Sequence, residues 1–462
     1  MRTKLPTLFS NRELLHTILL LAWPTVVEQA LQTIVQYADT AQVGQIGASA
    51  SAAVGLTTTV TWLINGIFFA AGVGFLSFIS QAIGAKKKEL ARSAAVQAIL
   101  TAFVLGIGVG GTAIAISPFL PDWLGAEAVI RENASAYFMI TSAPMIFRAF
   151  IVLLGCVLRA AGDTKTPMLN NGITNLLNII LNFLLINPAG TFHVGKLSIW
   201  GAGLGVKGAA IATAASYCVG GILMLLGIFK NPILSPKGEA FRPKKEILLP
   251  CLKVALPVVA ERTACSFGHV VFTSLVTKLG TLAVATHSIA LTAEQAFYIP
   301  GYGMQAAAAT LSGNAAGEKN ERKLMHTSAL ITLIAVSVMT VLSLLLFLFP
   351  GALMSVFTNN PAVISGGKTI LRIVAVSEPL FAVLIILEGV FNGVGDTKVP
   401  FLFTVISMWG VRILFTFLCV SVFHLGLSAV WVCMVLDNVS RCLMMSVRYL
   451  KGGWKSHLSF DS

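Results

Sequence analysis

Four polar residues in an apolar stretch near the start of the chain have types and spacing suited to binding an ion. They are Glu28, Gln32, Gln36 and Asp39, spaced four, four and three residues apart. At about 100° per residue, a helix presents all four on one face. A carboxylate at the bilayer centre costs roughly 2.5–3.5 kcal/mol on insertion scales, so it usually faces water, a partner or a substrate. The stripe predicts one wall of a polar pathway through a membrane, although a neighbouring helix that satisfies either carboxylate is an alternative.

Other polar residues interrupt later apolar stretches. A ladder of carboxamides three or four residues apart comprises Asn171, Asn175, Asn178 and Asn182. The second half contributes further candidates for lining a substrate cavity, which join Glu28, Gln32 and Gln36: they are Glu261, His269, Glu294 and Glu378. His269 fits a plain hydrogen bond between helices equally well. No Ser/His pairing or His/Asp metal cluster shares a face, so we expect neither an enzyme nor a certain metal site, and Na⁺ at Asp39 stays an open alternative.

The composition indicates which elements must carry these side chains. Hydrophobic residues make up 56% of the 462 and charged residues 11%, with a mean hydropathy of +0.84. Soluble domains carry roughly 25% charged residues, so this is an all-α polytopic membrane protein. Apolar stretches of spanning length predict twelve transmembrane helices. These lie near 14–38, 52–80, 94–117, 132–157, 167–187, 204–229, 247–277, 283–312, 325–349, 369–392, 400–423 and 427–447.

The net charge of +13 reflects membrane topology rather than nucleic-acid binding. With a cytoplasmic N-terminus, the predicted outer loops hold only Arg131, Lys196, Lys207, Lys278 and Lys368, while most of the other basic residues fall on the inner side. This asymmetry follows the positive-inside rule. We therefore expect a multi-pass protein of the plasma or inner membrane with both termini cytoplasmic, and no nucleic-acid partner. The seven cysteines all fall within predicted spans and indicate no disulfide or zinc site.

The chain repeats itself at an offset of 233 residues. Pro24 and Glu28 recur as Pro257 and Glu261, and Gln81-x-x-Gly84 recurs as Asn314-x-x-Gly317. A repeat of six spans keeps both copies in one orientation, with a pseudo-twofold axis along the membrane normal and substrate sites between the lobes. The expected parts are an N-terminal six-helix lobe, a cytoplasmic linker and a C-terminal six-helix lobe. Their ranges are 1–229, 230–246 and 247–462.

The loop Gly162-Asp-Thr-Lys165 recurs as Gly395-Asp-Thr-Lys398. Each loop precedes a predicted span. Aspartate is a preferred N-cap residue because its side chain accepts hydrogen bonds from the free N–H groups of the first helical turn. We therefore expect Asp163 and Asp396 to cap the fifth and eleventh spans.

Together these features resemble the multidrug and toxic compound extrusion (MATE) family in its bacterial form. The resemblance covers essentially the whole chain. The motifs that carry it are Asp39-Thr40, Gly44-x-x-Gly47, Gln81-x-x-Gly84-Ala85, the two Gly-Asp-Thr-Lys loops and Asn178-Ile-Ile-Leu-Asn182. It implies two six-helix lobes and the export of organic, often cationic, compounds driven by inward H⁺ or Na⁺. It also implies a monomer that needs no cofactor beyond that ion.

The resemblance also implies roles for individual residues. Asp39 matches the family's ion-coupling aspartate, and Asn178, Asn182 and Thr213 match positions that line the same cation site. Archaeal and some bacterial members have an aspartate where Asn182 stands, so a site with two carboxylates is not expected here. Glu261 lies on the helix where some members have a coupling glutamate, but it lies closer to Pro257 than that glutamate does.

A flippase for lipid-linked precursors is the alternative function, since related families with similar lobes perform it. Such a substrate carries a large anionic headgroup and would need several basic residues inside the cavity. The first lobe offers chiefly Arg148. Other lipid or metabolite exporters of related families belong to the same alternative.

Overall fold

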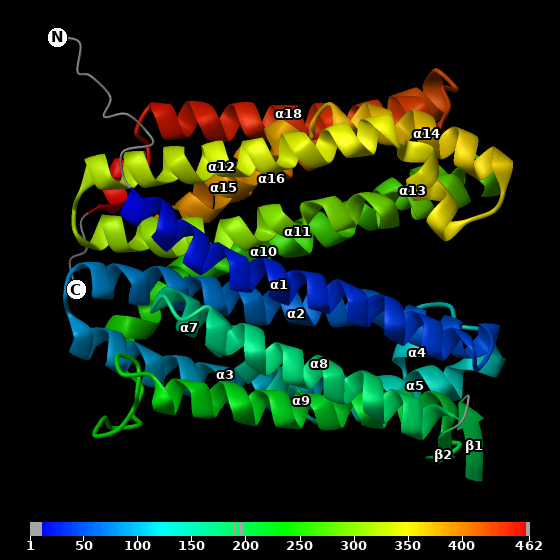
Figure 1. The fold of residues 1–462 in the computed structure, drawn as a ribbon, viewed down its shortest axis with the longest axis horizontal. Helices are drawn as coiled ribbons and strands as arrows, with labels where there is room; N and C mark the ends of the chain where they lie inside the picture. Colours follow the sequence, from blue (N-terminus) through cyan, green and yellow to red (C-terminus); the bar gives the residue numbers. More distant parts are fainter. Residues whose placement is uncertain (1–11, 188–189, 195–196, 459–462) are drawn as a thin grey trace. The chain divides into compact units, whose positions relative to one another are not determined.

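The computed structural model describes residues 12–187, 190–194 and 197–458, and they are predominantly helical (Figure 1). The first half contains α1 (Arg12–Gly44), α2 (Ala48–Gly84), α3 (Lys88–Ile116), α4 (Leu120–Trp123), α5 (Ala128–Ser142), α6 (Met145–Ala149), α7 (Gly155–Ala160), α8 (Lys165–Ile186) and α9 (Gly205–Lys230). The second half contains α10 (Lys245–Thr277), α11 (Thr281–Gly317), α12 (Glu321–Leu348), α13 (Pro350–Phe357), α14 (Pro361–Ala375), α15 (Glu378–Val394), α16 (Lys398–Ser407), α17 (Leu414–Phe417) and α18 (Leu427–Leu450).

The predicted membrane spans correspond to helices of sufficient length. Within the described residues, 8 helices are long and apolar enough to cross a membrane, or up to 10 if two bent pairs each count as one span. The helices α10 and α11 have 33 and 37 residues, and at about 1.5 Å per residue each exceeds the thickness of a bilayer. The eight helices, the two bent pairs, α10 and α11 together correspond to the twelve ranges expected from the sequence. The all-α membrane fold is therefore confirmed.

The sequence repeat is visible in the helix boundaries. The helices α1 and α2 span 12–44 and 48–84, and α10 and α11 span 245–277 and 281–317, which is the same offset of 233 at all four ends. The bends also correspond. One span bends by 62° between α5 and α6, next to Pro144, and its counterpart bends by 54° between α14 and α15, next to Pro379. Proline removes a backbone hydrogen bond from the helix, which explains why both spans break there.

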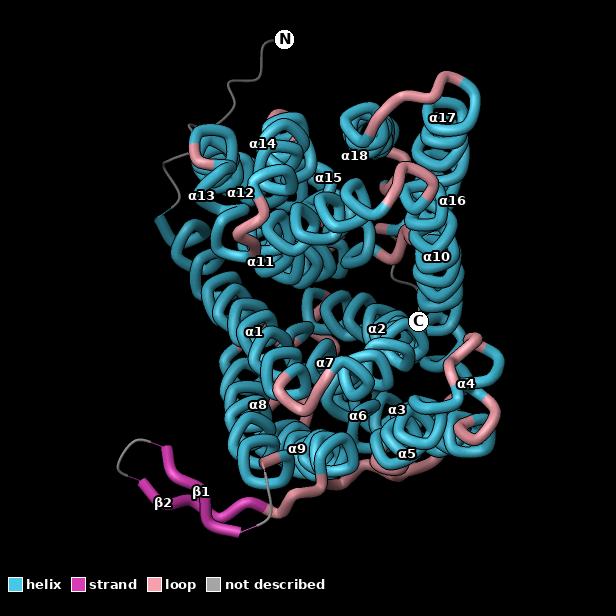
Figure 2. Tube along the Cα trace, turned by 90° about the vertical axis from the view of Figure 1, so that its right-hand side faces the viewer, coloured by secondary structure: helices cyan, strands magenta, loops and turns pink. Residues whose placement is uncertain are grey.

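A β-hairpin is an addition to the predicted fold. The strands β1 (Gly190–Val194) and β2 (Leu197–Gly201) pair antiparallel, with Gly190 opposite Gly201. They lie beside the N-terminal end of α9 in both ribbon views (Figure 2). The hairpin occupies the loop between α8 and α9. This loop is longer than the loop that precedes α18 in the second half.

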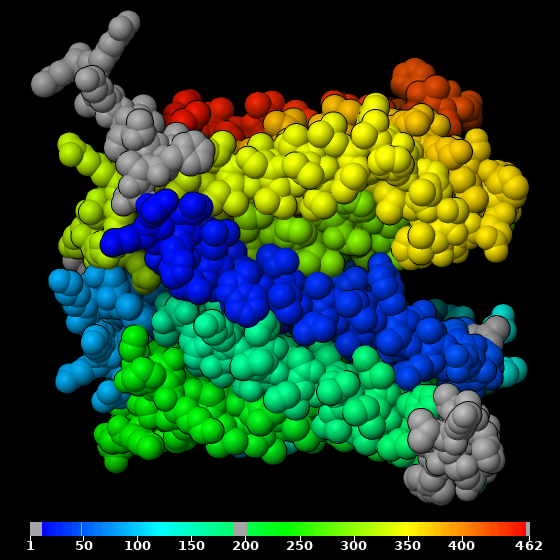
Figure 3. All heavy atoms as spheres, in the orientation of Figure 1, coloured from blue at the N-terminus to red at the C-terminus, as the bar shows by residue number. Residues whose placement is uncertain are grey.

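The chain forms two compact units that do not follow chain order. Unit 1 comprises Met1–Val26, Leu76–Lys87 and Pro250–Ser462, and unit 2 comprises Val27–Phe75 and Lys88–Leu249. The largest core cluster of unit 1 joins residues of α11, α12, α15 and α18 with the start of α1. In unit 2, the atoms of α8 and α9 are in contact along most of their length in the space-filling view (Figure 3).

The Gln81-x-x-Gly84 motif and its repeat form a close helix crossing within unit 1. A Cβ atom on Gly84 would lie 2.0 Å from the carbonyl oxygen of Asn314, and a Cβ on Gly317 would lie 1.9 Å from that of Gln81. Both distances are shorter than real Cβ contacts, so only glycine fits at either position. The Gln81 amide also donates to the carbonyl of Gly393 at 3.1 Å. The motif that signalled the repeat therefore joins the C-terminal ends of α2 and α11.

Candidate ion-coupling site

The side chain of Asp39 lies among carboxamides from α8 in unit 2. Its Oδ1 accepts a hydrogen bond from Nδ2 of Asn182 at 2.7 Å. The hydrogen-bond network orients the Asn178 amide with its nitrogen toward Asp39. In that orientation it donates to Oδ1 and Oδ2 at 2.8 and 3.2 Å, and its oxygen accepts from the hydroxyl of Thr213 on α9 at 3.3 Å. The structure thus brings together the four residues that the family resemblance connects with ion coupling.

The register of α1 against α8 explains how this group forms. The carboxylates Glu28 and Asp39 lie eleven residues apart, as do Asn171 and Asn182. Each asparagine donates to the carboxylate that precedes it by 143 residues. The polar stripe on α1 and the asparagine ladder on α8 are therefore joined by two hydrogen bonds, Asn171 to Glu28 and Asn182 to Asp39. One boundary differs from the sequence prediction. The first span was expected near 14–38, but α1 continues to Gly44, so Asp39 lies more than one turn inside it.

Glu28 forms a buried ion pair. Its side chain is 1% exposed, and Oε1 accepts from Nη2 of Arg159 at 2.6 Å and from Nδ2 of Asn171 at 2.5 Å. Arg159 lies in the last turn of α7, in a segment that the sequence assigned to an inner loop. These contacts are those of a packing residue satisfied by a neighbouring helix, which is the alternative that the sequence left open, and a place for Glu28 in a substrate cavity stays a prediction.

Asp39 differs from Glu28 because no cation neutralises it. Among the described residues of the chain it forms no ion pair, and its side chain is only partly buried. Tyr137 of α5 completes the surroundings through a hydrogen bond with Thr213. The side chains of Gln32 and Gln36, on the same stripe, are exposed and lie outside the hydrogen bonds described for this group. A carboxylate with only neutral partners is suited to exchanging a proton for a cation.

In unit 1, Glu261 occupies the repeat position of Glu28. It forms a hydrogen bond with Thr404, which stands where Asn171 stands in the first copy. The position equivalent to Arg159 is Asn392, so the arginine is not repeated. The charges that act on Glu261 are instead those of Glu388, Arg262 and Arg441, and Arg262 and Glu388 approach each other at 3.8 Å. Both copies of the repeat keep a carboxylate and a hydrogen-bond donor. They differ in the balance of the carboxylate's charge, because the first copy pairs it with Arg159 and the second copy has Asn392 at that position.

Two further carboxyl groups lie together in the same unit. Glu294 on α11 and Glu378 at the start of α15 are each 1% exposed. The hydroxyl of Tyr298 donates to Glu294, and its ring packs on Phe381 with the ring centroids 4.6 Å apart. The charge of Glu378 acts on Tyr298 as well. This pair belongs to unit 1, whereas the Asp39 group belongs to unit 2.

A buried cluster of charges between α18 and the helical segment Met408–Ile413 was not assigned any role from the sequence. Asp437 is 0% exposed and pairs with Arg412 at 2.8 Å and Arg441 at 2.9 Å, while the hydroxyl of Ser407 donates to it at 2.5 Å. The charges of both arginines and of Asp437 reach His269, whose side chain is exposed. Ionisable residues within two successive apolar stretches were the signal in the sequence, and the four-residue spacing of Asp437 and Arg441 places them on one helix face, but the sequence does not show that Arg412 joins them. The described residues contain no group of three or more His, Cys, Asp or Glu side chains suited to a transition metal.

The two loop aspartates have different roles. Asp163 accepts from the backbone N–H of Thr166 at 3.0 Å and from its hydroxyl at 2.8 Å, so the predicted cap of α8 is confirmed. The equivalent prediction for Asp396 is wrong. Its buried carboxylate instead pairs with Arg448 of α18 at 2.7 Å, because a guanidinium gives a charged partner where the first copy has none.

Comparison of the sequence with known protein families identifies the family to which the chain belongs. The sequence pattern of the MatE family matches residues 24–184 and again residues 257–418, so the two matches begin at the repeated prolines Pro24 and Pro257. The chain belongs to the MatE family. It is therefore a membrane transporter of the multidrug and toxic compound extrusion type, as the resemblance implied.

Similar proteins cover nearly the full chain. A probable multidrug resistance protein NorM of Thermotoga maritima is 28% identical over 96% of this chain and 94% of its own. The multidrug resistance protein NorM of Vibrio parahaemolyticus is 25% identical over 95% of both chains. Among solved structures, an outward-facing multidrug resistance MATE family transporter of the MOP superfamily has a TM-score of 0.87 at 25% identity, covering 96% of both chains.

Proposed function

We propose that this chain is a secondary active antiporter that exports organic compounds, cationic or amphipathic, in exchange for H⁺ or Na⁺. The multidrug resistance names of its relatives support the substrate class. The observation that carries the proposal is the partly buried Asp39, which has two carboxamides beside it and forms no ion pair with any residue that the structure describes. When a proton occupies the carboxyl, the group is neutral, and when a cation replaces the proton, the carboxylate balances its charge.

This exchange gives coupling a physical basis. A ligand shifts a two-state equilibrium only by its differential affinity for the two states. An ion at Asp39 and an organic cation that need the same negative charge favour opposite states, which is the minimum requirement for antiport. The oxygen atoms of Asp39 and Thr213 would also suit Na⁺, a hard cation that prefers oxygen ligands. Alternating access would move the two halves of the repeat, 1–229 and 247–462, about the linker 230–246.

The proposal includes topology and assembly. We place the protein in the plasma or inner membrane as a monomer with both termini cytoplasmic, because basic residues dominate the loops on that side. Reporter fusions at each terminus test the orientation. Activity in a reporter that works only outside the cytoplasm would contradict it.

Transport in proteoliposomes tests the proposed activity and identifies the ion. Vesicles containing the purified protein are given a pH gradient or a Na⁺ gradient, and the movement of a cationic dye such as ethidium is followed. We expect accumulation against the dye gradient under one of the two ion gradients and its loss when an ionophore collapses that gradient. Dye movement that is only downhill and independent of both gradients would contradict antiport.

A further inference from the structure

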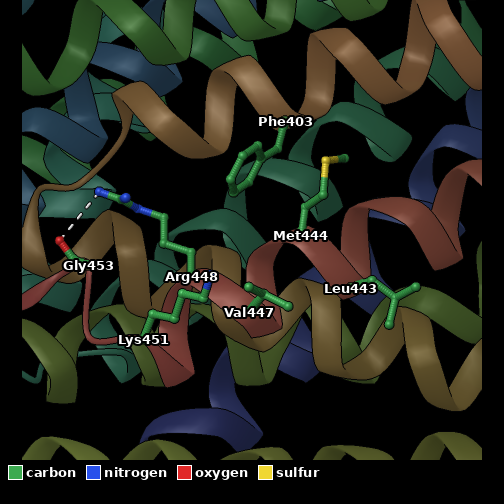
Figure 4. Close-up of a pocket in the computed structure, with 7 residues that line it drawn as sticks. All are labelled: Phe403, Leu443, Met444, Val447, Arg448, Lys451 and Gly453. Carbon is green, nitrogen blue, oxygen red and sulfur yellow. Dashed lines mark hydrogen bonds between the residues drawn. The ribbon is translucent and has the colours of Figure 1, made fainter.

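A groove on the surface of unit 1 lies beside the C-terminal end of α18 (Figure 4). Its volume is about 430 Å³. One wall comes from Phe403 of α16, which lies near Met444 in the close-up, and the others come from α18 and the turn after it. The lining residues are Phe403, Leu443, Met444, Val447, Arg448, Lys451 and Gly453.

The groove is apolar along its length and basic at one end. Leu443 is 61% exposed and Val447 is 48% exposed, and both belong to the span α18. In a bilayer these side chains face acyl chains. Arg448 and Lys451 follow at the end of the same helix, where the span meets the headgroup region. A molecule that fills the groove must therefore combine a hydrocarbon part with an anionic part.

The two basic residues differ in how their charges are used. The Arg448 guanidinium pairs with the buried Asp396 at 2.7 Å and also donates to the carbonyl of Gly453 at 3.4 Å. These contacts hold it at the edge of the groove. The Lys451 side chain is exposed, and no hydrogen bond or ion pair is described for its ammonium group among residues 12–187, 190–194 and 197–458. Lys451 thus supplies the uncompensated positive charge.

We propose that this groove binds an anionic phospholipid of the membrane leaflet next to the C-terminal end of α18. Its phosphate accepts hydrogen bonds from Lys451 and from the edge of the Arg448 guanidinium. One acyl chain lies along Phe403, Leu443 and Val447. Basic pockets beside transmembrane helices bind anionic headgroups in this way, with an attraction of about 1 kcal/mol for each basic residue. A soluble phosphate would use only the basic end and would leave the exposed apolar walls uncovered.

Native mass spectrometry of the purified full chain tests the proposal, with phosphatidylglycerol and phosphatidylcholine added as probes. We expect the wild-type protein to bind phosphatidylglycerol in preference to phosphatidylcholine at one saturable site. Lys451→Gln should weaken that binding roughly fivefold, the equivalent of one basic residue's attraction. Lys455→Gln is the matched control, since Lys455 lies four residues away, pairs with Glu321 at 2.5 Å and does not line the groove.

A second variant tests the apolar walls without changing charge. Val447→Trp fills the groove from a half-exposed position, so folding should be unaffected, and binding of phosphatidylglycerol should be lost. Equal weakening by Lys451→Gln and Lys455→Gln would show a general effect of charge and overturn the assignment to the groove. Unchanged binding of phosphatidylglycerol in Val447→Trp would also overturn the assignment. Competition by inorganic phosphate at concentrations similar to those of the lipid would overturn it as well, because the groove would then be an ion site only.

Discussion

Glu28 and Asp39 lie on one face of α1, and each accepts a hydrogen bond from an asparagine of α8. Their difference lies in a third residue. Arg159 reaches Glu28 at 2.6 Å and neutralises it, whereas no described residue forms an ion pair with Asp39. A buried pair that is complete stabilises the local fold, and a carboxylate without a cation remains available to a mobile one. The two acids of one stripe therefore differ in how their charge is balanced.

The task of Glu28 can be tested by removing its charge. Glu28→Gln leaves Arg159 buried without its counter-charge, which typically destabilises by about 3–5 kcal/mol. We expect a clear fall in the thermal unfolding temperature in detergent, with dye transport per folded molecule retained. Glu132→Gln is the control, because that carboxylate is 86% exposed and its pair with Lys207 contributes little.

Neutralising both members of the pair refines this test. In the double variant Glu28→Gln with Arg159→Met, no unpaired charge remains, so part of the lost stability should return. A Glu28→Gln protein that is as stable as wild type but inactive in transport would instead place Glu28 in the transport mechanism.

At the residue scale, the sequence predicted which polar residues share a helix face, but it did not predict which residues of other helices they contact. The spacing of the stripe and of the asparagine ladder predicted two polar helix faces, and the family resemblance associated Asp39 with Asn178, Asn182 and Thr213. Arg159 was missed as the partner of Glu28 because the two are 131 residues apart and Arg159 was assigned to a loop. Periodicity shows which residues share a face, and it does not show which other helix that face meets.

At the scale of elements, the long apolar windows predicted the spans well, because a bilayer requires about 20 apolar residues per helix. The bends next to Pro144 and Pro379 and the hairpin β1–β2 were not predicted. In a membrane both lipid-facing and protein-facing sides are apolar, so hydrophobicity alone does not reveal where helices pack or break. Close packing in these helices is signalled by small residues instead.

The crossing of α2 and α11 gives a direct test of that packing. Gly317→Ala places a methyl group 1.9 Å from the carbonyl oxygen of Gln81, so the helices must separate. Overpacking of this kind costs about 1–3 kcal/mol, and we expect a lower unfolding temperature and less folded protein in the membrane. Fluorescence-detected size-exclusion chromatography measures both.

Gly108→Ala is the matched control for this variant. It lies in α3, and a Cβ there meets no heavy atom within 4 Å, so its stability should equal or slightly exceed that of wild type. If Gly317→Ala behaved like Gly108→Ala, the crossing would not require glycine.

At the scale of the whole molecule, the repeat preserves the framework and changes the chemistry. Helix ends and bends recur at the same offset, yet Phe272 stands where Asp39 would recur, and Asn392 stands where Arg159 would recur. The second copy has its own acids in Glu294 and Glu378, which lie beside Tyr298. Two copies with one backbone pattern and different ionisable groups allow one copy to bind the ion while the other has a different function.

The most direct test of ion coupling at Asp39 is gradient-driven dye export by Asp39→Asn in proteoliposomes, compared with wild type at equal protein content. Asparagine keeps the shape and most of the hydrogen bonding of Asp39 but carries no exchangeable charge, so the variant should fold normally. Asp122→Asn is the control, because it makes the same change at an exposed pair with Arg131. We predict that Asp39→Asn loses export under the imposed gradient and that Asp122→Asn keeps it. Export by Asp39→Asn at a rate near that of wild type would contradict the account and direct attention to Glu261 or Glu378.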